Sequence, residues 1–591
     1  MLPLNRATLA HAPCSAARAF ALERHATPAV QFDAVLIGDI LRRQAAPTGL
    51  PGKPALLYEG RAVTFAELNV QANRLANALL GLGLRSGDRV ALLGRNSPEW
   101  VAAYYAAAKC GAVLVPVNFW YRAGEIGYLL RDSGARFCLL AQAHATAAAE
   151  LRAAADPVPV EHWIWLDGRP AGTGTDTGHA GVVDDQTIDE LMAAASAEEP
   201  APPGGLPDER APHIILYTSG TTGFPKGAVL SHRAHVLHAM TFALHTGAVA
   251  DDVYLNVYPL FHTGGTDCAV LPYHLVGATV ALLPDPKSEA VLAALERYRV
   301  SAMMAVPTIW RRLVETLDTA PGSAPNVHRR DLSAFKRAMG SSDAMPLDLL
   351  QQVMHTFNAS WTQTYGLTEA GCILTYLPPA DHTRKLGSAG KPHAQADLRV
   401  ADAARADEPE WPLGEGHRLP AGQPGEVVAR TEHAMNGYWN RPEQTAAALV
   451  DAGDGGQPWL RTGDVGYLDE EGYLFMAGRL KDVIISGGEK IYPAEVEPAL
   501  AGYPGVRDLA LVGVPDREWG ESVLAVVVLG DAEDAEHPGD AAGFDGEAFK
   551  RWARGRVAGF KTPRRVVLVD ALPRTSTGKV QKAVLREQFK G

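Results

Sequence analysis

Short apolar runs that alternate with helix-like stretches are the feature that most limits the folds open to this chain of 591 residues. The runs span residues 90–93, 112–115 and 137–140, and the stretches between them begin near Pro98 and Ala123. This strand, helix, strand order is typical of right-handed βαβ units on a mostly parallel sheet. We therefore predict an α/β fold, with a large N-terminal domain of parallel-rich sheets packed with helices.

A second local signal marks the start of one helix. Thr64 is followed three residues later by Glu67, which is the capping-box pattern of a helix N-terminus. The stretch TFAELNVQANRLANALL, which starts at Thr64, is amphipathic in the way that a surface helix requires. These residues predict a helix that begins directly after Thr64.

The length of the chain requires more than one domain, because single hydrophobic cores stop growing near roughly 250–300 residues. Past Gly478 the pattern changes to strand-like runs at residues 509–514 and 523–529, between which we expect helices. We predict a loose N-terminal extension over 1–45, a large domain over 46–480 and a small mobile α+β domain over 481–591. Tracts rich in Pro, Gly and acidic residues at 169–181, 200–208 and 530–547 are expected to be surface loops.

Composition excludes several classes of partner. The chain has 55 Lys and Arg residues and 67 Asp and Glu residues, which gives a net charge of −12. This negative charge disfavours constitutive binding to nucleic acid or to an anionic membrane. The five cysteines are widely separated and form no C-x-x-C pair, so we expect reduced thiols. The most apolar stretch, 100–117, is interrupted by Lys109 and Gly111 and falls short of a membrane span. We expect a cytoplasmic protein with no nucleic-acid partner and no membrane span, and either a monomer or a homodimer.

One segment joins a β-prone run to a loop suited to an anion. The run at 214–217 leads into TSGTTGFPKG, which extends from Thr218 to Gly227 and includes Lys226. Its glycines let backbone N–H groups come close to a ligand, and its hydroxyls and lysine add further donors, so the loop favours a polyphosphate. The lysine does not stand in the Gly-Lys-Ser/Thr order of a P-loop, which excludes Walker geometry. A flexible hairpin turn is the alternative.

This loop, followed by Ser231-His232, resembles the phosphate loop of the adenylate-forming superfamily, which includes acyl-CoA synthetases, peptide-synthetase adenylation domains and luciferases. Its other motifs follow in order between Leu57 and Lys582: the acyl-side motif YPLFH (258–262), the adenine and magnesium motif QTYGLTE (363–369), the ribose motif WLRTGD (459–464), the hinge GRLKD (478–482) and the lysine loop PRTSTGK (573–579). The chain most resembles an acyl- or aryl-CoA synthetase.

The resemblance implies two half-reactions. A carboxylate attacks the α-phosphate of ATP to give an acyl adenylate and pyrophosphate, and the thiol of coenzyme A then displaces AMP. Because the first step brings an anion against a polyanion, the site must supply donors and cations aimed at the phosphates. By resemblance, the catalytic residues are Lys579, Glu369, Thr368 and His262, and Glu369 holds Mg²⁺. The alternative for Glu369 is an acid at the N-terminus of a helix.

The nucleotide site is also implied by the resemblance. Tyr365 offers a flat face to adenine, and Asp464 binds both ribose hydroxyls. Asp343 either accepts from the adenine amino group or caps a helix that begins near Pro346. The full set expected to bind ATP or AMP is Thr218, Ser219, Gly220, Thr221, Thr222, Gly223, Lys226, Ser342, Asp343, Ala344, Thr364, Tyr365, Asp464 and Arg479.

The second half-reaction implies a rotation of the C-terminal domain about a hinge at Lys481, because the thiol must reach the carbonyl that Lys579 shielded. The rotation would bring a glycine-containing loop to the coenzyme A thiol. That loop consists of Ser486, Gly487, Gly488 and Glu489.

The class of acid is predicted from the residues that, by resemblance to the family, line the acyl pocket. These are His235, His262, Thr266, Gly340, Ser341, Thr364 and Gly371. They are mostly small or neutral and include no arginine for a second carboxylate, so we expect a fatty or aromatic monocarboxylic acid. His232, His235 and His238 lie at i, i+3 and i+6, and on a helix the outer two diverge by about 240°, which disfavours a shared metal.

Three other functions use the same motifs or part of them. An adenylating enzyme of this superfamily can deliver its acyl group to a separate carrier protein in place of coenzyme A. A luciferase-like oxygenase shares all the motifs. A non-catalytic nucleotide-binding protein is disfavoured because Lys226, Glu369, Asp464 and Lys579 are all present.

Overall fold

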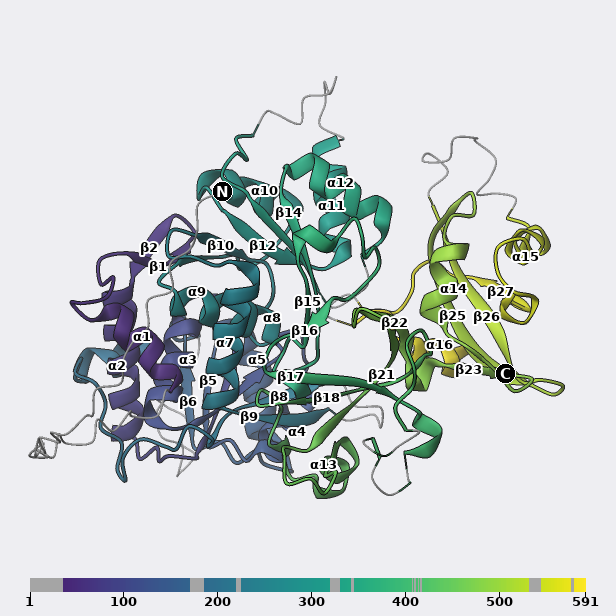
Figure 1. The fold of residues 1–591 in the computed structure, drawn as a ribbon. Coiled ribbons are helices and arrows are strands. Elements are labelled where there is room, and N and C mark those ends of the chain that lie inside the picture. Colours follow the sequence, from purple (N-terminus) through teal and green to yellow (C-terminus); the bar gives the residue numbers. More distant parts are fainter. Residues whose placement is uncertain are drawn as a thin grey trace, which may run out of the picture. The chain divides into compact units, whose positions relative to one another are not determined.

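The computed structural model describes residues 36–170, 185–218, 225–318, 330–341, 345–406, 408, 411–412, 414, 417–530, 544–575 and 579–590. In this part of the chain the strands form four sheets, two of them large and rich in parallel pairs (Figure 1). The predicted α/β class is confirmed.

The first large sheet has the order β16-β15-β14-β13-β12-β10-β11-β1-β2. Its strands are β1 (Pro54–Tyr58), β2 (Arg61–Thr64), β10 (Val253–Asn256), β11 (Thr279–Leu282), β12 (Ala302–Ala305), β13 (Arg337–Gly340), β14 (Ser360–Tyr365), β15 (Thr375–Leu377) and β16 (Lys391–Pro392). The strands from β14 through β13, β12, β10 and β11 to β1 are parallel neighbours. The carboxyl ends of β13 and β14 therefore lie at one edge of the sheet.

The second large sheet has the order β19-β9-β8-β4-β3-β5-β6-β7. Its strands are β3 (Arg89–Leu93), β4 (Val113–Val117), β5 (Phe137–Leu140), β6 (His162–Trp165), β7 (Gln186–Thr187), β8 (Pro212–Thr218), β9 (Lys226–Ser231) and β19 (Gly437–Tyr438). The predicted βαβ units are confirmed: β3, β4 and β5 are parallel, and α3 (Pro98–Cys110) and α4 (Ala123–Ser133) connect them.

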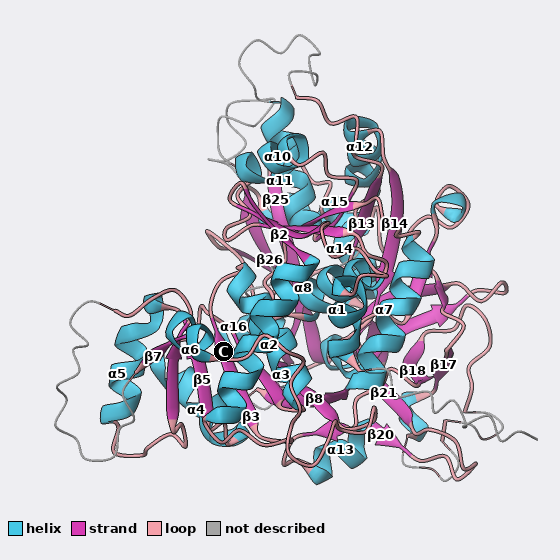
Figure 2. Cartoon of the chain, turned by 90° about the vertical axis from the view of Figure 1, so that its left-hand side faces the viewer, coloured by secondary structure: helices cyan, strands magenta, loops and turns pink. Residues whose placement is uncertain are grey.

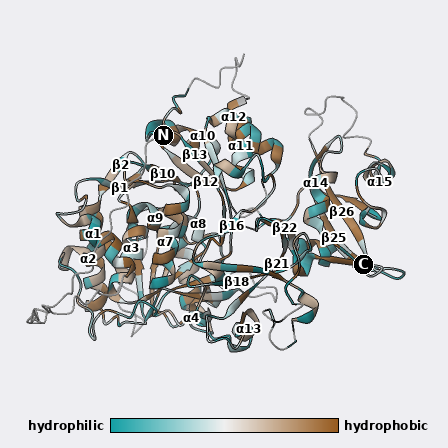
Figure 3. Cartoon of the chain, viewed as in Figure 1, coloured by the Kyte–Doolittle hydropathy of each residue, from teal (hydrophilic) through white to brown (hydrophobic). Residues whose placement is uncertain are grey.

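Helices among these strands build the main core. The predicted helix after Thr64 is α2 (Phe65–Gly81), and its capping box is present: the Glu67 N–H donates to Thr64 Oγ1 at 3.2 Å. Figure 2 shows α1 (Ile37–Ala45), α2 and α3 close together, and α3 is largely hydrophobic in Figure 3 and buried along its length.

Residues 37–45, which the sequence predicts as part of a loose N-terminal extension, form α1. Ile37, Ile40 and Leu41 share one face of α1 and are buried in the main core, because an i, i+3, i+4 spacing puts apolar side chains on the same side of a helix. The remaining helices are α5 (Ala145–Ala153), α6 (Ile188–Ala194), α7 (His232–Thr246), α8 (Thr263–Gly265), α9 (Leu271–Leu275), α10 (Ser288–Arg297), α11 (Pro307–Asp318), α12 (Leu347–Phe357) and α13 (Pro442–Ala448). None of the described helices is long and apolar enough to cross a membrane.

Two smaller sheets follow in the chain. The antiparallel one contains β17 (Ala396–Ala401), β18 (Gly425–Thr431), β20 (Leu449–Val450), β21 (Trp459–Leu468) and β22 (Leu474–Arg479). The last contains β23 (Ile484–Ser486), β24 (Glu489–Ile491), β25 (Val506–Asp516), β26 (Gly520–Leu529) and β27 (Arg565–Leu568), with α14 (Pro493–Leu500), α15 (Gly546–Arg554) and α16 (Lys582–Phe589) in the same region. Its α+β content agrees with the prediction, whereas the boundary at 481 and the mobility stay predictions.

Two details of this region differ from expectation. The helices expected between 514 and 523 are absent from this described stretch, because β25 and β26 form one antiparallel hairpin. Its turn is stabilised locally: Asp516 accepts backbone hydrogen bonds from Glu518 and Trp519, and Gly520 has a φ of +77°. The tract at 530–547 is not all loop either, since α15 begins at Gly546 with Asp545 as its cap.

Candidate active site

Glu369 lies at a meeting point of three segments. It belongs to the short 3-10 helix η4 (Thr368–Ala370), which follows β14. Its Oε1 accepts hydrogen bonds from Thr218 Oγ1 at 3.2 Å and from Tyr438 Oη at 2.9 Å. Among the described residues its other oxygen, Oε2, accepts none, so one face of the carboxylate remains available to a cation. The helix that Glu369 was alternatively expected to begin is only this single turn.

Tyr438 was not among the predicted site residues. Burial and the Glu369 charge raise its pKa, so its hydroxyl stays protonated and donates. The Lys226 ammonium lies 5.3 Å from the centroid of the Tyr438 ring, which joins the lysine of the phosphate loop to the same group. No spacing in the sequence pointed to Tyr438, because it reaches Glu369 from β19, which pairs with β9.

The phosphate loop connects two antiparallel strands. β8 ends at Thr218, β9 begins at Lys226, and these two residues are partners in the register. The two strands therefore form a hairpin, which was the alternative prediction for this loop. At its ends, the Thr218 hydroxyl contacts Glu369, and the Lys226 ammonium lies over the Tyr438 ring. Ser219, Gly220, Thr221, Thr222 and Gly223 lie outside the described residues.

The predicted adenine and ribose residues form one chain of contacts. Tyr365 Oη donates to Asp464 Oδ2 at 2.9 Å, and Arg479 Nε lies 2.7 Å from Asp464 Oδ1. Burial opposes the charged guanidinium, but Asp464, Tyr365 and Glu369 together raise the pKa of Arg479. The electrostatic effect of Glu369 on Arg479 shows that these adenine and ribose residues lie near Glu369, where Thr218 of the phosphate loop also makes its contact. Ser342, Asp343 and Ala344 lie outside the described residues, and the N-cap of α12 is Pro346.

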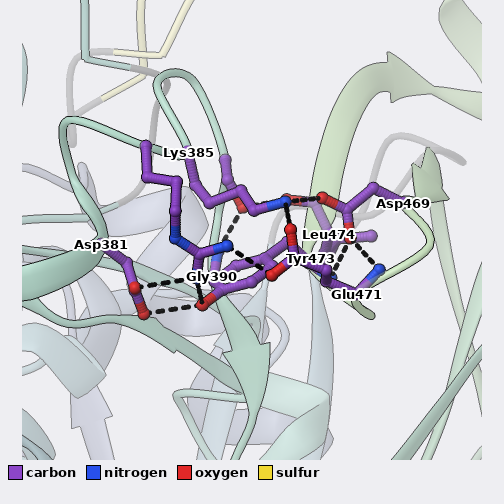
Figure 4. Close-up of polar contacts among 9 residues, drawn as sticks. Asp381, Lys385, Gly390, Asp469, Glu471, Tyr473 and Leu474 are labelled. Atoms are coloured by element: carbon purple, nitrogen blue, oxygen red, sulfur yellow. Dashed lines mark hydrogen bonds and ion pairs between the residues drawn. The ribbon is translucent and has the colours of Figure 1, made fainter.

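The hairpin that carries Asp464 and Arg479 is fastened at its far end (Figure 4). Tyr473 Oη donates to Asp381 Oδ2 at 2.7 Å, and Lys385 Nζ lies 2.6 Å from Asp469 Oδ2. The Leu474 N–H also donates to the carbonyl of Gly390 at 2.8 Å. These contacts hold the turn between β21 and β22 against the segment that leads into β16, next to β15 and β14.

His262 lies at the start of α8, where its Nδ1 accepts from the Gly264 N–H at 3.0 Å. Burial and then the positive charge of Lys579 lower its pKa to about 4, so the imidazole is neutral near pH 7. The effect of Lys579 shows that the lysine loop and the acyl-side motif lie within electrostatic range. The loop is closed on itself: the Lys579 N–H donates to Thr575 Oγ1 at 3.1 Å, and the Thr575 N–H to the Lys579 carbonyl at 2.8 Å.

Several predicted acyl-pocket residues have structural roles. A Cβ on Gly340 would lie 2.3 Å from the Trp361 ring, and one on Gly371 2.2 Å from the His433 carbonyl, so both glycines are required by close packing. Gly371 also has a φ of +71°. The Thr364 hydroxyl donates to the Gly340 carbonyl at 3.0 Å, within the sheet. Thr266 and Ser341 are buried.

The three α7 histidines point to different neighbours. His232 packs against His213 at 4.8 Å between ring centroids. His235 Nδ1 lies 3.0 Å from Asp267 Oδ1, deep in the core. His238 instead lies beside Cys268 and Cys372, a grouping the sequence analysis missed because 104 residues separate the two cysteines.

The predicted hinge and coenzyme A loop are also placed. Lys481 belongs to η7 (Leu480–Asp482), where Arg586 of α16 donates to its carbonyl at 2.7 Å and pairs with Asp482. The turn after Ser486, formed by Gly487 and Gly488, connects β23 to β24, which begins at Glu489. A Cβ on Gly487 would lie 2.6 Å from the Trp519 ring. The absence of a side chain at Gly487 therefore lets the Trp519 ring pack closely against the backbone of this turn.

Residues from the phosphate, magnesium and ribose motifs thus converge, although they come from three different sheets. This convergence defines an enzyme of the adenylate-forming class. The family described as AMP-binding enzyme matches residues 41–439, and its C-terminal domain matches 495–579. The chain therefore belongs to the AMP-binding enzyme family, as the motifs predicted.

Relatives of known activity support the ligase assignment. The chain is 36% identical over 539 residues to a feruloyl-CoA synthase of Amycolatopsis sp, which covers 91% of this chain and 96% of that protein. It is 35% identical over 556 residues to the long-chain-fatty-acid–CoA ligase FadD13 of Mycobacterium tuberculosis, covering 94% and 98%. The crystal structure of the anthranilate CoA ligase AuaEII with anthranoyl-AMP superimposes with a TM-score of 0.78 at 27% identity, covering 94% and 98%. The chain is an enzyme of the acid–CoA ligase type.

Proposed function

We propose that this enzyme joins an aromatic monocarboxylic acid to coenzyme A through an acyl adenylate, with ATP and Mg²⁺. The observation that carries the proposal is the double hydrogen bond to Glu369 Oε1 beside Lys226, next to the Tyr365, Asp464 and Arg479 chain. Together these groups provide donors and cations at one end and a ring and carboxylate at the other. That is the distribution an adenosine triphosphate requires.

Glu369 is the residue proposed to hold Mg²⁺. A carboxylate oxygen is the kind of ligand that this hard cation prefers, and Oε2 accepts no hydrogen bond within the described residues, so the group fits. When bound, Mg²⁺ neutralises phosphate oxygens. The chain's own groups do the rest: Thr218 and Tyr438 orient the carboxylate, and Lys579 is proposed to neutralise the acid and the α-phosphate as they meet.

The aromatic acid is inferred from the named activities of two similar proteins. The feruloyl-CoA synthase and the anthranilate CoA ligase are both named for aromatic acids. FadD13 is named for long-chain fatty acids, so a fatty acid is the competing class of substrate.

The test is AMP release from ATP with a panel of ferulate, substituted benzoates, indoleacetate and fatty acids, each with and without coenzyme A. We expect coenzyme A-dependent AMP formation with kcat/KM at least tenfold higher for an aromatic acid than for any fatty acid. Preference for a long fatty acid would contradict the aromatic assignment. Pyrophosphate exchange without coenzyme A turnover would indicate a carrier protein as acceptor.

A further inference from the structure

Two cysteines from distant parts of the chain meet inside the core. Cys268 belongs to the π-helical segment η2 (Thr266–Val270), and Cys372 follows η4. Their sulfur atoms are 3.2 Å apart, and the two residues are 1% and 5% exposed. The other described cysteines, Cys110 and Cys138, are also free and buried.

The backbone at Cys372 is unusual. Its φ is +100°, in the left-handed region where a side chain is uncommon outside glycine and asparagine. The Cys372 N–H donates to the Leu367 carbonyl at 3.2 Å, which helps to hold this conformation. Strained backbone of this kind is concentrated at functional sites. The conformation directs the thiol to Cys268.

His238 completes the cluster. Its Nε2 lies 3.1 Å from the Asp267 carbonyl, so the ring donates there and leaves Nδ1 as the free lone pair. Nδ1 is buried; burial lowers the pKa of His238, but the interactions with Cys372 and Asp267 outweigh it and raise that pKa. A ligand atom of His238 lies within 4.8 Å of both sulfur atoms. A basic nitrogen beside two thiols favours the thiolate, the reactive form of cysteine.

The electrostatics agree with this arrangement. The hydrogen bond with Cys268, followed by the effect of His238, lowers the pKa of Cys372 to about 6, whereas burial raises the pKa of Cys268. The Cys372 sulfur is thus the thiolate nucleophile, and the Cys268 sulfur remains a protonated thiol. Disulfide formation begins from a thiolate of this kind beside a second thiol.

From this geometry we infer that Cys268 and Cys372 form a site of reversible oxidation, a disulfide that switches the ligase off. The oxidant is a peroxide. The Cys372 thiolate attacks one peroxide oxygen, the O–O bond breaks, and hydroxide leaves and takes up a proton to give water and a sulfenic acid. The Cys268 sulfur then attacks Cys372 Sγ, the S–O bond breaks, and the departing hydroxide takes the Cys268 proton. Two thiols and one H₂O₂ thereby give one disulfide and two waters.

A metal site made by the same three side chains is the competing interpretation. Two thiolates that bind one zinc ion at about 2.3 Å in tetrahedral geometry lie about 3.8 Å apart. The observed 3.2 Å is shorter than that separation, and at this distance the two thiols are hydrogen-bonded to each other. The described residues also provide only three ligands at this place. The observations therefore favour oxidation.

The effect on activity follows from where the bond would form. Closing the sulfur atoms from 3.2 Å to about 2.05 Å shortens their separation by about 1.2 Å, and rotation of the two side chains and movement of the two segments share this change. One segment carries Glu369 three residues before Cys372, and the other follows His262. Displacements of about 1 Å in a catalytic constellation can reduce the rate about a hundredfold. This step, unlike the disulfide itself, rests on the proposed roles of Glu369 and His262.

The test uses the full chain with Cys14→Ser, because Cys14 lies outside the described residues. Reduced protein is treated with H₂O₂, remaining thiols are alkylated, and peptides are mapped by mass spectrometry. We expect a linked Cys268–Cys372 peptide, a loss of AMP-forming activity of at least tenfold, and recovery of both with dithiothreitol. Cys138→Ala, a buried cysteine elsewhere, is the control and should behave like the parent.

Cys268→Ala and Cys372→Ala should resist the peroxide-dependent loss, provided that circular dichroism shows both to be folded. If either does not fold, the peptide map of the parent decides the question. Absence of the linked peptide under conditions that oxidise other thiols would overturn the site, whatever the activity. A linked peptide without loss of activity would overturn the switch. Stoichiometric zinc that survives dialysis and protects both thiols would establish the metal site in its place.

Discussion

The hydroxyl of Tyr438 provides the sharpest test of how Glu369 is held. Tyr438→Phe removes the donor that lies 2.9 Å from Glu369 Oε1 and keeps the ring beneath Lys226. A hydrogen bond to a charged group contributes about 1.5–3 kcal/mol. The lower end applies because Thr218 still donates to the same oxygen at 3.2 Å. A loss of about 1.5 kcal/mol corresponds to about a tenfold fall in kcat/KM for adenylation.

The assay is ATP–pyrophosphate exchange at saturating acid over a range of Mg²⁺ concentrations. If Glu369 holds the cation, Tyr438→Phe should raise the Mg²⁺ concentration needed for half-maximal rate, and excess Mg²⁺ should restore part of the activity. Tyr376→Phe is the matched control, because it removes a buried hydroxyl that has no partner among the described residues. An unchanged Mg²⁺ dependence in Tyr438→Phe, or an equal effect in Tyr376→Phe, would refute the reasoning.

Three further outcomes are expected. Lys579→Ala should abolish adenylation but spare thioester formation from a supplied acyl adenylate, and equal loss of both steps would contradict its role. Lys481→Pro, which restricts φ, should slow thioester formation more than adenylation, as rapid-quench measurements of each half-reaction would show. Burial lowers the pKa of His274 to about 4, from about 6.5 in the unfolded chain. The preference of the fold for the neutral imidazole therefore adds to the free energy of unfolding above pH 6.5, and this contribution is lost as the pH falls toward 4. In urea unfolding, wild type should lose about 2 kcal/mol more than His274→Gln between pH 7.5 and 5, and equal losses would exclude this contribution.

Local sequence was sufficient for elements whose signals lie within one segment. The Thr64 and Glu67 capping box, the βαβ order from β3 to β5 and the start of α12 near Pro346 were all predictable, because caps and periodicity act over a few residues. Helix α1 was missed although its Ile37, Ile40 and Leu41 carry the spacing of a buried face. The Ala- and Arg-rich residues before it concealed that signal.

For the candidate site, the motifs predicted residues but not the side chains that contact them. The motifs named Glu369, Asp464 and Tyr365, but no pattern pointed to Tyr438 as the donor to Glu369. Gly371 was assigned to the acyl pocket, whereas its φ and the His433 carbonyl are what require a glycine there. His235 was assigned to the pocket as well, and its imidazole lies against Asp267 in the core.

The sequence by itself determined the βαβ order from β3 to β5, the family and the residues proposed to meet ATP, because these depend on neighbouring residues and on motifs of fixed spacing. Only the tertiary structure decided which distant side chains touch. The end of β8 and the turn after β14 bring Thr218 and Glu369, which are 151 residues apart, within hydrogen-bond distance. Side-chain contacts at such separations leave no periodicity in the sequence. The Cys268, Cys372 and His238 cluster therefore became visible only in the fold.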